Sequence, residues 1–192
     1  GDTPQVLREL SISLERVGSV QRLNGRLEAA VSAYRESLDM ARRLREQLGD
    51  TPQVLQELSD SLDRVGGVEL SRGRLDEAMS AFRESLALRL HLHTQLGDTP
   101  QVLRDLSTSF NNMGDAERDS GRLDAALSAY SQSLVFRKRL REQLGDTPQV
   151  TYDLRHILQK LVSLDDELVS GEKRRAWQAL LESLPQTSSL NN

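Results

Sequence analysis

The order of apolar and polar positions along the chain predicts helices. Between residues 51 and 72, apolar side chains recur every three or four positions, the spacing of one face of an α-helix. They are Val54, Leu55, Leu58, Leu62, Val65 and Val68. A second such stretch runs towards Gly97 and carries Leu75, Ala78, Met79, Ala81, Phe82, Leu86 and Leu88. Strand signals are absent, so the expected fold class is all-α.

Residues that start and stop helices stand at the ends of these stretches. Thr51 occupies an N-cap position and is followed by proline, which is favoured at the first helical position. Gly73 stands where a glycine can adopt the left-handed conformation after a helix, and Gly97 ends the second stretch. Each helix is therefore predicted to span about 20 residues, or roughly 30 Å.

The same arrangement recurs with a period of 48 residues. The string Gly-Asp-Thr-Pro-Gln-Val begins at Gly1, Gly49, Gly97 and Gly145. An isolated helix pair cannot bury its apolar stripe, but stacking the next pair against it can. We therefore expect a solenoid, an α-α superhelix of antiparallel helix pairs, forming one domain over residues 1–192. Its repeats are 1–48, 49–96 and 97–144, with a divergent capping repeat at 145–192.

A glycine interrupts the middle of each first helix, at Gly18, Gly66 and Gly114. Glycine inside a helix costs about 1 kcal/mol relative to alanine. A cost that is repeated three times indicates close approach of a neighbouring helix. The facing small residues are expected to be Ala30, Ala78 and Ala126.

These positions resemble the tetratricopeptide repeat, in which a large apolar residue, a Leu-Gly pair, an alanine and an aromatic residue follow in order. The matching residues are Leu14, Val17-Gly18, Ala30 and Tyr34; Leu62, Val65-Gly66, Ala78 and Phe82; and Phe110, Met113-Gly114, Ala126 and Tyr130. The period exceeds the family's usual 34 residues, so long-repeat members such as kinesin light chains are the nearer relatives. The resemblance implies a right-handed superhelix with a concave face that binds a protein or peptide.

In this family the first helices line the concave face. Carried over to this chain, the candidate partner-binding residues are Glu15, Arg16, Ser19, Arg22, Asp63, Arg64, Gly67, Asn111, Asn112, Asp115, Arg118 and Asp119. None is a lysine, so the grip on a terminal carboxylate used by short chaperone-binding members is not expected. Asn111 and Asn112 lead the set because an amide both donates to and accepts from a peptide backbone. The alternative for each residue is an ordinary solvated helix face.

The fourth repeat departs from the others. Two extra residues between Leu164 and Gly171 bring Ala176 and Leu180 onto the alanine and aromatic places. Trp177 is then expected to cover the end of the core, with a partner contact as the alternative. The polar tail from Gln186 to Asn192 is expected to fray. The N-terminal end has no comparable capping repeat. We expect either that further repeats precede Gly1 or that this end binds a partner.

Residues for catalysis or metal binding are sparse. The chain has no cysteine and three histidines, of which His91 and His93 point about 200° apart on a helix. Motifs for nucleophilic serine, zinc-binding histidine pairs and phosphate loops are missing. The acidic run Asp165–Glu167 lacks EF-hand spacing and is expected to be a solvated surface. We therefore expect no enzyme, no metal site and no cofactor.

Charge and hydropathy limit the partners further. The net charge is −4, and the basic clusters at Arg42–Arg45 and Arg137–Arg141 are interrupted in the second repeat, so nucleic acid is not an expected partner. No stretch approaches the roughly 18 apolar residues of a membrane span. A reducing cytoplasm is the expected setting.

The sequence thus predicts a non-catalytic scaffold or sensor module for protein–protein interaction, as a segment of a larger bacterial-type protein. The alternative is a structural module that forms homo-oligomers by stacking through its repeat ends.

Overall fold

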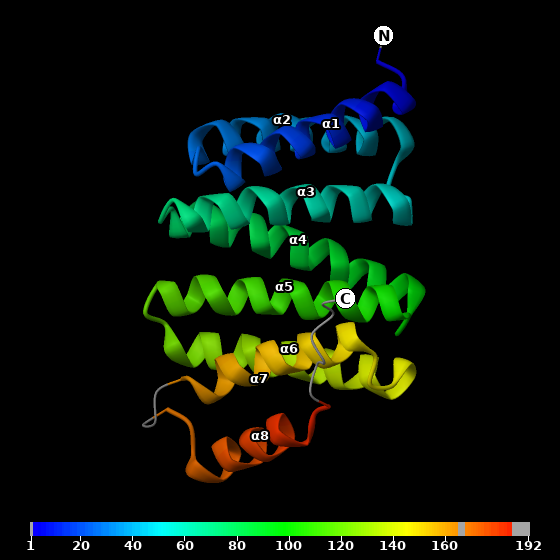
Figure 1. Cartoon of the computed structure of the whole chain (residues 1–192). Helices are drawn as coiled ribbons and strands as arrows, with labels where there is room; N and C mark the ends of the chain where they lie inside the picture. The colour runs from blue at the N-terminus through cyan, green and yellow to red at the C-terminus, as the bar shows by residue number, and fades with distance from the viewer. Residues whose placement is uncertain (1, 165–167, 186–192) are drawn as a thin grey trace, which may run out of the picture. The chain divides into compact units, whose positions relative to one another are not determined.

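The computed structural model describes residues 2–164 and 168–185, and within these ranges the chain forms eight helices and no strand. They are α1 (Pro4–Leu23), α2 (Leu27–Leu48), α3 (Pro52–Ser71), α4 (Leu75–Leu96), α5 (Pro100–Asp119), α6 (Leu123–Leu144), α7 (Pro148–Val162) and α8 (Gly171–Ser183) (Figure 1). The all-α prediction is confirmed. The acidic run Asp165–Glu167 and the tail from Gln186 to Asn192 lie outside the described residues.

The predicted helix ends are confirmed in atomic detail. At the start of α3, the Thr51 hydroxyl accepts a hydrogen bond from the Val54 N–H at 3.4 Å. After α3, Gly73 has a φ of +73°, and the N–H of Arg74 donates to the carbonyl of Glu69 at 2.9 Å. This closes the helix with the left-handed glycine motif, which only a residue without Cβ adopts at low cost.

The chain divides into two compact units, Gly1–Gly97 and Asp98–Asn192, and the division falls at a repeat boundary. The N-terminal unit holds α1 to α4, and the C-terminal unit holds α5 to α8. Inside each unit, consecutive helices pack against each other, joined by short turns except for the longer link between α7 and α8 (Figure 1). A single domain over residues 1–192 stays a prediction.

The core of the N-terminal unit shows how one repeat buries the next. Helix α2 contacts both α1 and α3. Its buried residues meet those of α3 in one apolar cluster, to which α4 adds Ala81. The cluster comprises Ala30, Val31, Tyr34, Leu38 and Ala41 of α2 with Leu58, Leu62, Val65 and Val68 of α3. Within this unit, the second helix of one repeat therefore covers the first helix of the next, as the stacking argument expects.

The mid-helix glycines mark the closest helix contacts. A Cβ placed on Gly66 would lie 2.6 Å from Cε1 of Phe82, and one on Gly18 would lie 2.6 Å from Cε1 of Tyr34. The third repeat places the Tyr130 ring 2.4 Å from a Cβ on Gly114. Close approach is therefore confirmed. The group nearest to each glycine is the aromatic ring of the second helix and not the buried alanine, so our assignment of the facing residue is corrected.

The fourth repeat folds differently from the alignment proposed above. Ala176 is exposed, whereas Ala30 is fully buried, so its placement on the alanine position was wrong. The reason is that α7 has 15 residues and ends at Val162, while the other first helices have 20 residues. The C-cap of α7 is Ser163, and Gly171 is the first residue of α8. Arg174 donates to the carbonyls of Val162 and Leu164, at 2.6 and 2.8 Å.

Helix α8 accordingly has no buried residue. Trp177 and Leu181 are half-buried, while Leu184, just beyond the helix, is buried. A role for Trp177 as the cap of the core stays a prediction.

Candidate interaction surfaces

In the N-terminal unit, charged residues of neighbouring repeats meet between α1 and α3. Nη2 of Arg64 lies 3.1 Å from Oε2 of Glu15, and Nε of Arg8 lies 2.9 Å from Oε1 of Glu57. The sequence analysis placed Glu15 and Arg64 on one face, and the structure brings them together. It did not identify Arg8 and Glu57. These two residues are separated by one repeat plus one residue, the same spacing as Glu15 and Arg64. That shared spacing could have indicated the second pair.

These ion pairs border a groove of about 160 Å³. Its lining residues are Arg8, Ser11, Ile12, Glu15, Leu44, Glu57, Asp60 and Arg64. Leu44 is buried and Ile12 is exposed, so apolar contact surface lies beside charges of both signs. Burial raises the pKa of Glu15 above its ordinary value, while the Arg64 guanidinium opposes this shift. The groove therefore offers donors, acceptors and an apolar contact to an incoming chain.

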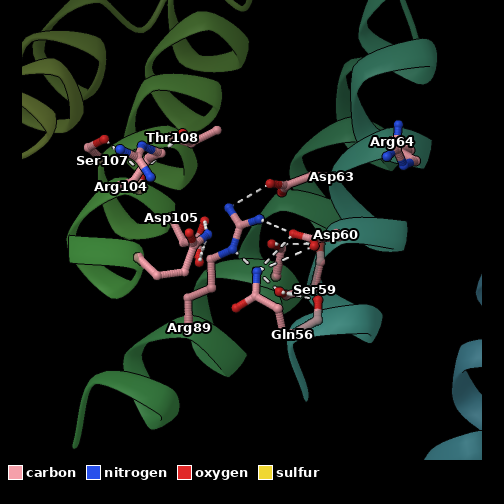
Figure 2. Close-up of polar contacts among 12 residues, drawn as sticks. Gln56, Ser59, Asp60, Asp63, Arg64, Arg89, Arg104, Asp105, Ser107 and Thr108 are labelled. Carbon is pink, nitrogen blue, oxygen red and sulfur yellow. Dashed lines mark hydrogen bonds and ion pairs between the residues drawn. The ribbon is translucent and has the colours of Figure 1, made fainter. Parts of the chain in front are cut away.

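Asp63, another predicted site residue, belongs to an internal ion-pair cluster. The nearly buried Arg89 of α4 places Nη1 2.6 Å from Oδ2 of Asp63 and Nη2 2.8 Å from Oδ1 of Asp60. Figure 2 shows the guanidinium directed at both carboxylates. Gln56 also donates to Asp60, at 3.2 Å. Burial raises the pKa of Asp63, and the positive charge of Arg89 opposes the rise.

A second polar cluster lies in the C-terminal unit around Lys160. Its ammonium Nζ is 2.7 Å from both carboxylate oxygens of Asp115 and 3.0 Å from Oδ1 of Asn111. The Tyr130 hydroxyl donates to Asp115 at 2.7 Å, and the Lys160 Nζ lies 5.5 Å from the Tyr130 ring centroid. Burial lowers the pKa of Lys160, although the Asp115 carboxylate opposes the shift.

Sequence analysis found Asn111 and Asp115 but missed Lys160. The 48-residue period could have indicated Lys160, because position 160 is the fourth-repeat equivalent of Arg16 and Arg64, which are also cations. Asn111 is buried, and its amide also donates to Asp115 at 3.3 Å. Its amide therefore already donates one hydrogen bond and accepts another inside the unit.

The other predicted residues are more open. Arg16, Arg22 and Arg118 are exposed, and Arg118 Nη2 lies 2.9 Å from Oδ1 of the exposed Asp119. The half-buried Ser19 has its hydroxyl 3.0 Å from that of Tyr34, Asn112 is half-buried, and Gly67 has open space where a Cβ would stand. That these residues bind a partner remains a prediction.

The buried phenol of Tyr130 predicts a loss of stability at alkaline pH. Burial, together with the hydrogen bond to Asp115, raises its pKa above the ordinary value near 10. Above about pH 10 the unfolded phenol loses its proton while the folded one keeps it, so the free energy of unfolding falls with rising pH.

We expect Tyr130→Phe to remove the contribution of this phenol to the fall in the free energy of unfolding. That contribution is up to about 1.4 kcal/mol per pH unit above pH 10. Urea unfolding of both proteins from pH 8 to 11 measures the difference. Lys160, whose pKa is lowered, contributes with the opposite sign and is present in both proteins. Parallel pH profiles for the two proteins would contradict the prediction.

Residues 2–164 and 168–185 contain no group of three or more His, Cys, Asp or Glu side chains that could hold a metal ion. In the same ranges, no helix combines the length and apolar character needed to cross a membrane.

No protein-family model matches the chain, and no curated protein is significantly similar to it. Among solved structures, it is similar to the crystal structure of the de novo designed helical repeat protein DHR64. The match has a TM-score of 0.50 and 20% sequence identity, and it covers 94% of this chain and 96% of that chain. The chain has a helical repeat fold. Stacked repeats of this kind create extended surfaces that repeat proteins use for binding.

Proposed function

We propose that this helical repeat protein is a tetratricopeptide-type module that binds a protein or peptide on its first helices and catalyses no reaction. The contacts of Gly18, Gly66 and Gly114 with the aromatic rings of their own repeats support the assignment to this repeat type. The groove between α1 and α3 is the observation that carries the proposed binding function.

The chemistry of the groove suits a peptide segment. Arg8 and Arg64 can donate to backbone carbonyls or acidic side chains, and Glu57 and Asp60 can accept from N–H groups or basic side chains. The ion pairs across the groove are partly exposed to solvent, and such pairs contribute about 1 kcal/mol or less. A ligand can therefore exchange them for its own contacts at little cost, while Ile12 supplies apolar surface.

The predicted residues then divide into two roles. We propose as direct contacts the open residues Arg16, Arg22, Arg64, Gly67, Asn112, Arg118 and Asp119. We propose as positioning residues the internally paired Glu15, Ser19, Asp63, Asn111 and Asp115. The second group holds the cations and hydroxyls beside it in place, as Asn111 and Asp115 do for Lys160.

A peptide selection tests this function. A random peptide library is displayed and selected on the immobilised full chain, and the affinity of the selected peptides is measured by calorimetry. We expect Arg64→Ala to weaken the binding of selected peptides at least about tenfold, as truncation of a central interface arginine does. Circular dichroism should show unchanged helicity, because the Arg64 side chain is 42% exposed.

The matched control is Arg43→Ala on α2. Arg43 is also an exposed arginine with one carboxylate partner, Asp2 at 3.2 Å, but it does not line the groove. Its removal should leave the affinities unchanged. If no peptide is selected, or if both variants bind equally well, the proposed function is rejected.

A further inference from the structure

Helix α1 exposes an apolar stripe whose counterparts are buried. The α1 stripe consists of Val6, Leu10, Val17 and Val20, all of which are exposed. One repeat later, the same positions in α3 hold Val54, Leu58, Val65 and Val68, all of which are buried. The exposed fraction is 55% for Val20 but 1% for Val68, and 49% for Val17 but 7% for Val65.

The contrast arises from what covers each stripe. Helix α2 packs on α3 in the N-terminal unit, and α6 packs on α7 in the C-terminal unit, where Val150, Leu154, Leu161 and Leu164 are buried. The stripe is thus a helix-packing surface in both units. On α1, no helix of the described N-terminal unit occupies it.

The spacing of the α1 stripe is that of a coiled-coil seam. Val6, Leu10, Ser13, Val17 and Val20 follow one another in steps of four, three, four and three residues. This 3.5-residue period keeps one line of side chains facing a partner helix. Ser13 is the small central residue of the seam, and its hydroxyl is satisfied by donating to the Glu9 carbonyl at 2.8 Å.

Two exposed charges of opposite sign flank the seam on one side. They are Glu9 and Arg16. Their counterparts in α3, Glu57 and Arg64, both reach across to the neighbouring first helix, where they pair with Arg8 and Glu15. In α3, which has a neighbouring first helix, the residues at these two positions therefore form ion pairs with that helix.

We propose that α1 packs antiparallel against α1 of a second copy of this chain, forming a twofold symmetric dimer through the α1 stripe. With Val6 opposite Val17 of the second copy and Leu10 opposite its Ser13, Glu9 lies opposite Arg16 of the second copy. Twofold symmetry forms this ion pair twice. Shifting the helices by one heptad would instead place the two Arg16 side chains opposite each other, so the charges select one register.

Among the described residues 168–185, α8 does not offer a surface that matches the α1 stripe. The exposed positions of α8 include Glu172, Lys173, Arg175, Gln178 and Glu182, and they form no apolar stripe. A second copy of α1, which carries the same stripe and the same flanking charges, provides the matching surface and closes the dimer. The α1 stripe does not line the peptide groove. Arg16, one of the proposed peptide contacts, is paired in the dimer, so the dimer is tested in the absence of peptide.

Light scattering of the full chain over a range of concentrations tests the dimer. We expect the mass to rise with concentration from 21.5 kDa to twice that value and then to remain constant. Val17→Glu should hold the mass at that of the monomer at every concentration. The matched control Val135→Glu changes a similarly exposed valine on α6 and should dimerise as the wild type does.

Charge reversal tests the orientation and register. Glu9→Arg or Arg16→Glu alone places like charges opposite each other and should raise the dimer dissociation constant at least about tenfold. The double variant Glu9→Arg/Arg16→Glu restores both ion pairs and should dimerise within about threefold of the wild type. Circular dichroism checks that each variant remains helical.

Three results would overturn the proposal. The first is a wild-type mass that stays at 21.5 kDa throughout. The second is a dimer that survives Val17→Glu, which would place the interface elsewhere. The third is a double charge variant that remains as weak as the single ones, which would exclude the antiparallel register. The mass measurements without peptide decide the dimer, and the comparison of Arg64→Ala with Arg43→Ala decides peptide binding, so the two proposals can fail separately.

Discussion

Gly66→Leu is expected to lower the free energy of unfolding by about 3 kcal/mol, at the upper end of the usual cost of overpacking a core. A Cβ at this position would stand 2.6 Å from Cε1 and 2.7 Å from Cδ1 of Phe82, before any of the larger side chain is added. Phe82 is fully buried, so its ring cannot swing out into solvent. The helices α3 and α4 would have to separate.

Urea unfolding of the full chain, followed by circular dichroism, measures the loss. The neighbouring residue supplies the control, because a Cβ on Gly67 meets nothing within 4 Å. Gly67→Ala should raise the stability by about 0.5–1 kcal/mol, the helix propensity difference. In repeat proteins stability is roughly a sum of repeats and interfaces, so the loss at Gly66 should lower the stability of the whole N-terminal unit. An unfolding midpoint equal to that of the wild type would contradict the packing argument.

Arg72→Leu is the second substitution with a large expected effect, about 3 kcal/mol of destabilisation. The Glu69 carboxylate is fully buried and contacts two guanidinium groups, with Arg72 Nη1 at 2.8 Å and Arg35 Nη2 at 2.6 Å. The Arg72 side chain is 13% exposed and the Arg35 side chain is 55% exposed. Removing the buried cation leaves a buried carboxylate without its main compensation, which typically costs 3–5 kcal/mol.

Arg35→Leu is the matched control, since it removes the exposed partner of the same carboxylate. We expect a loss of about 1 kcal/mol or less, because solvent screens that pair. The double variant Glu69→Leu/Arg72→Leu should recover much of the stability, since an apolar pair can replace a buried ion pair of similar volume. Equal losses for Arg72→Leu and Arg35→Leu, measured by urea unfolding, would show that burial does not set the strength of this interaction.

The helix boundaries were predictable because they depend on residues close together in the chain. The Thr51 cap acts on Val54, three residues away, and the left-handed Gly73 closes α3 through bonds within five residues. The aromatic contact of Gly66 was only partly predictable. Its repetition indicated close approach, but which side chain fills the space depends on the rotamer of Phe82, 16 residues away.

The candidate sites were harder to predict, because they join residues of different repeats. Arg8 and Glu57 are 49 residues apart, and Lys160 lies 45 residues from Asp115. The sequence indicated Asn111 as a ligand contact because its amide can donate to and accept from a peptide backbone. Its engagement by Lys160 follows from the packing of α7 beside it, which no local pattern records.

The sequence by itself determined that this chain is all-α, that it repeats every 48 residues, and where its regular helices begin and end. Those features follow from apolar periodicity and capping, which act over a few residues. Only the tertiary structure decided which charges pair, that Glu69 is buried, and that Ala176 is exposed after the shortened α7. It also decided that the stripe of α3 is covered while that of α1 is open. The four residues of the two stripes are identical, and their burial differs because burial depends on what packs against a residue as well as on the residue itself.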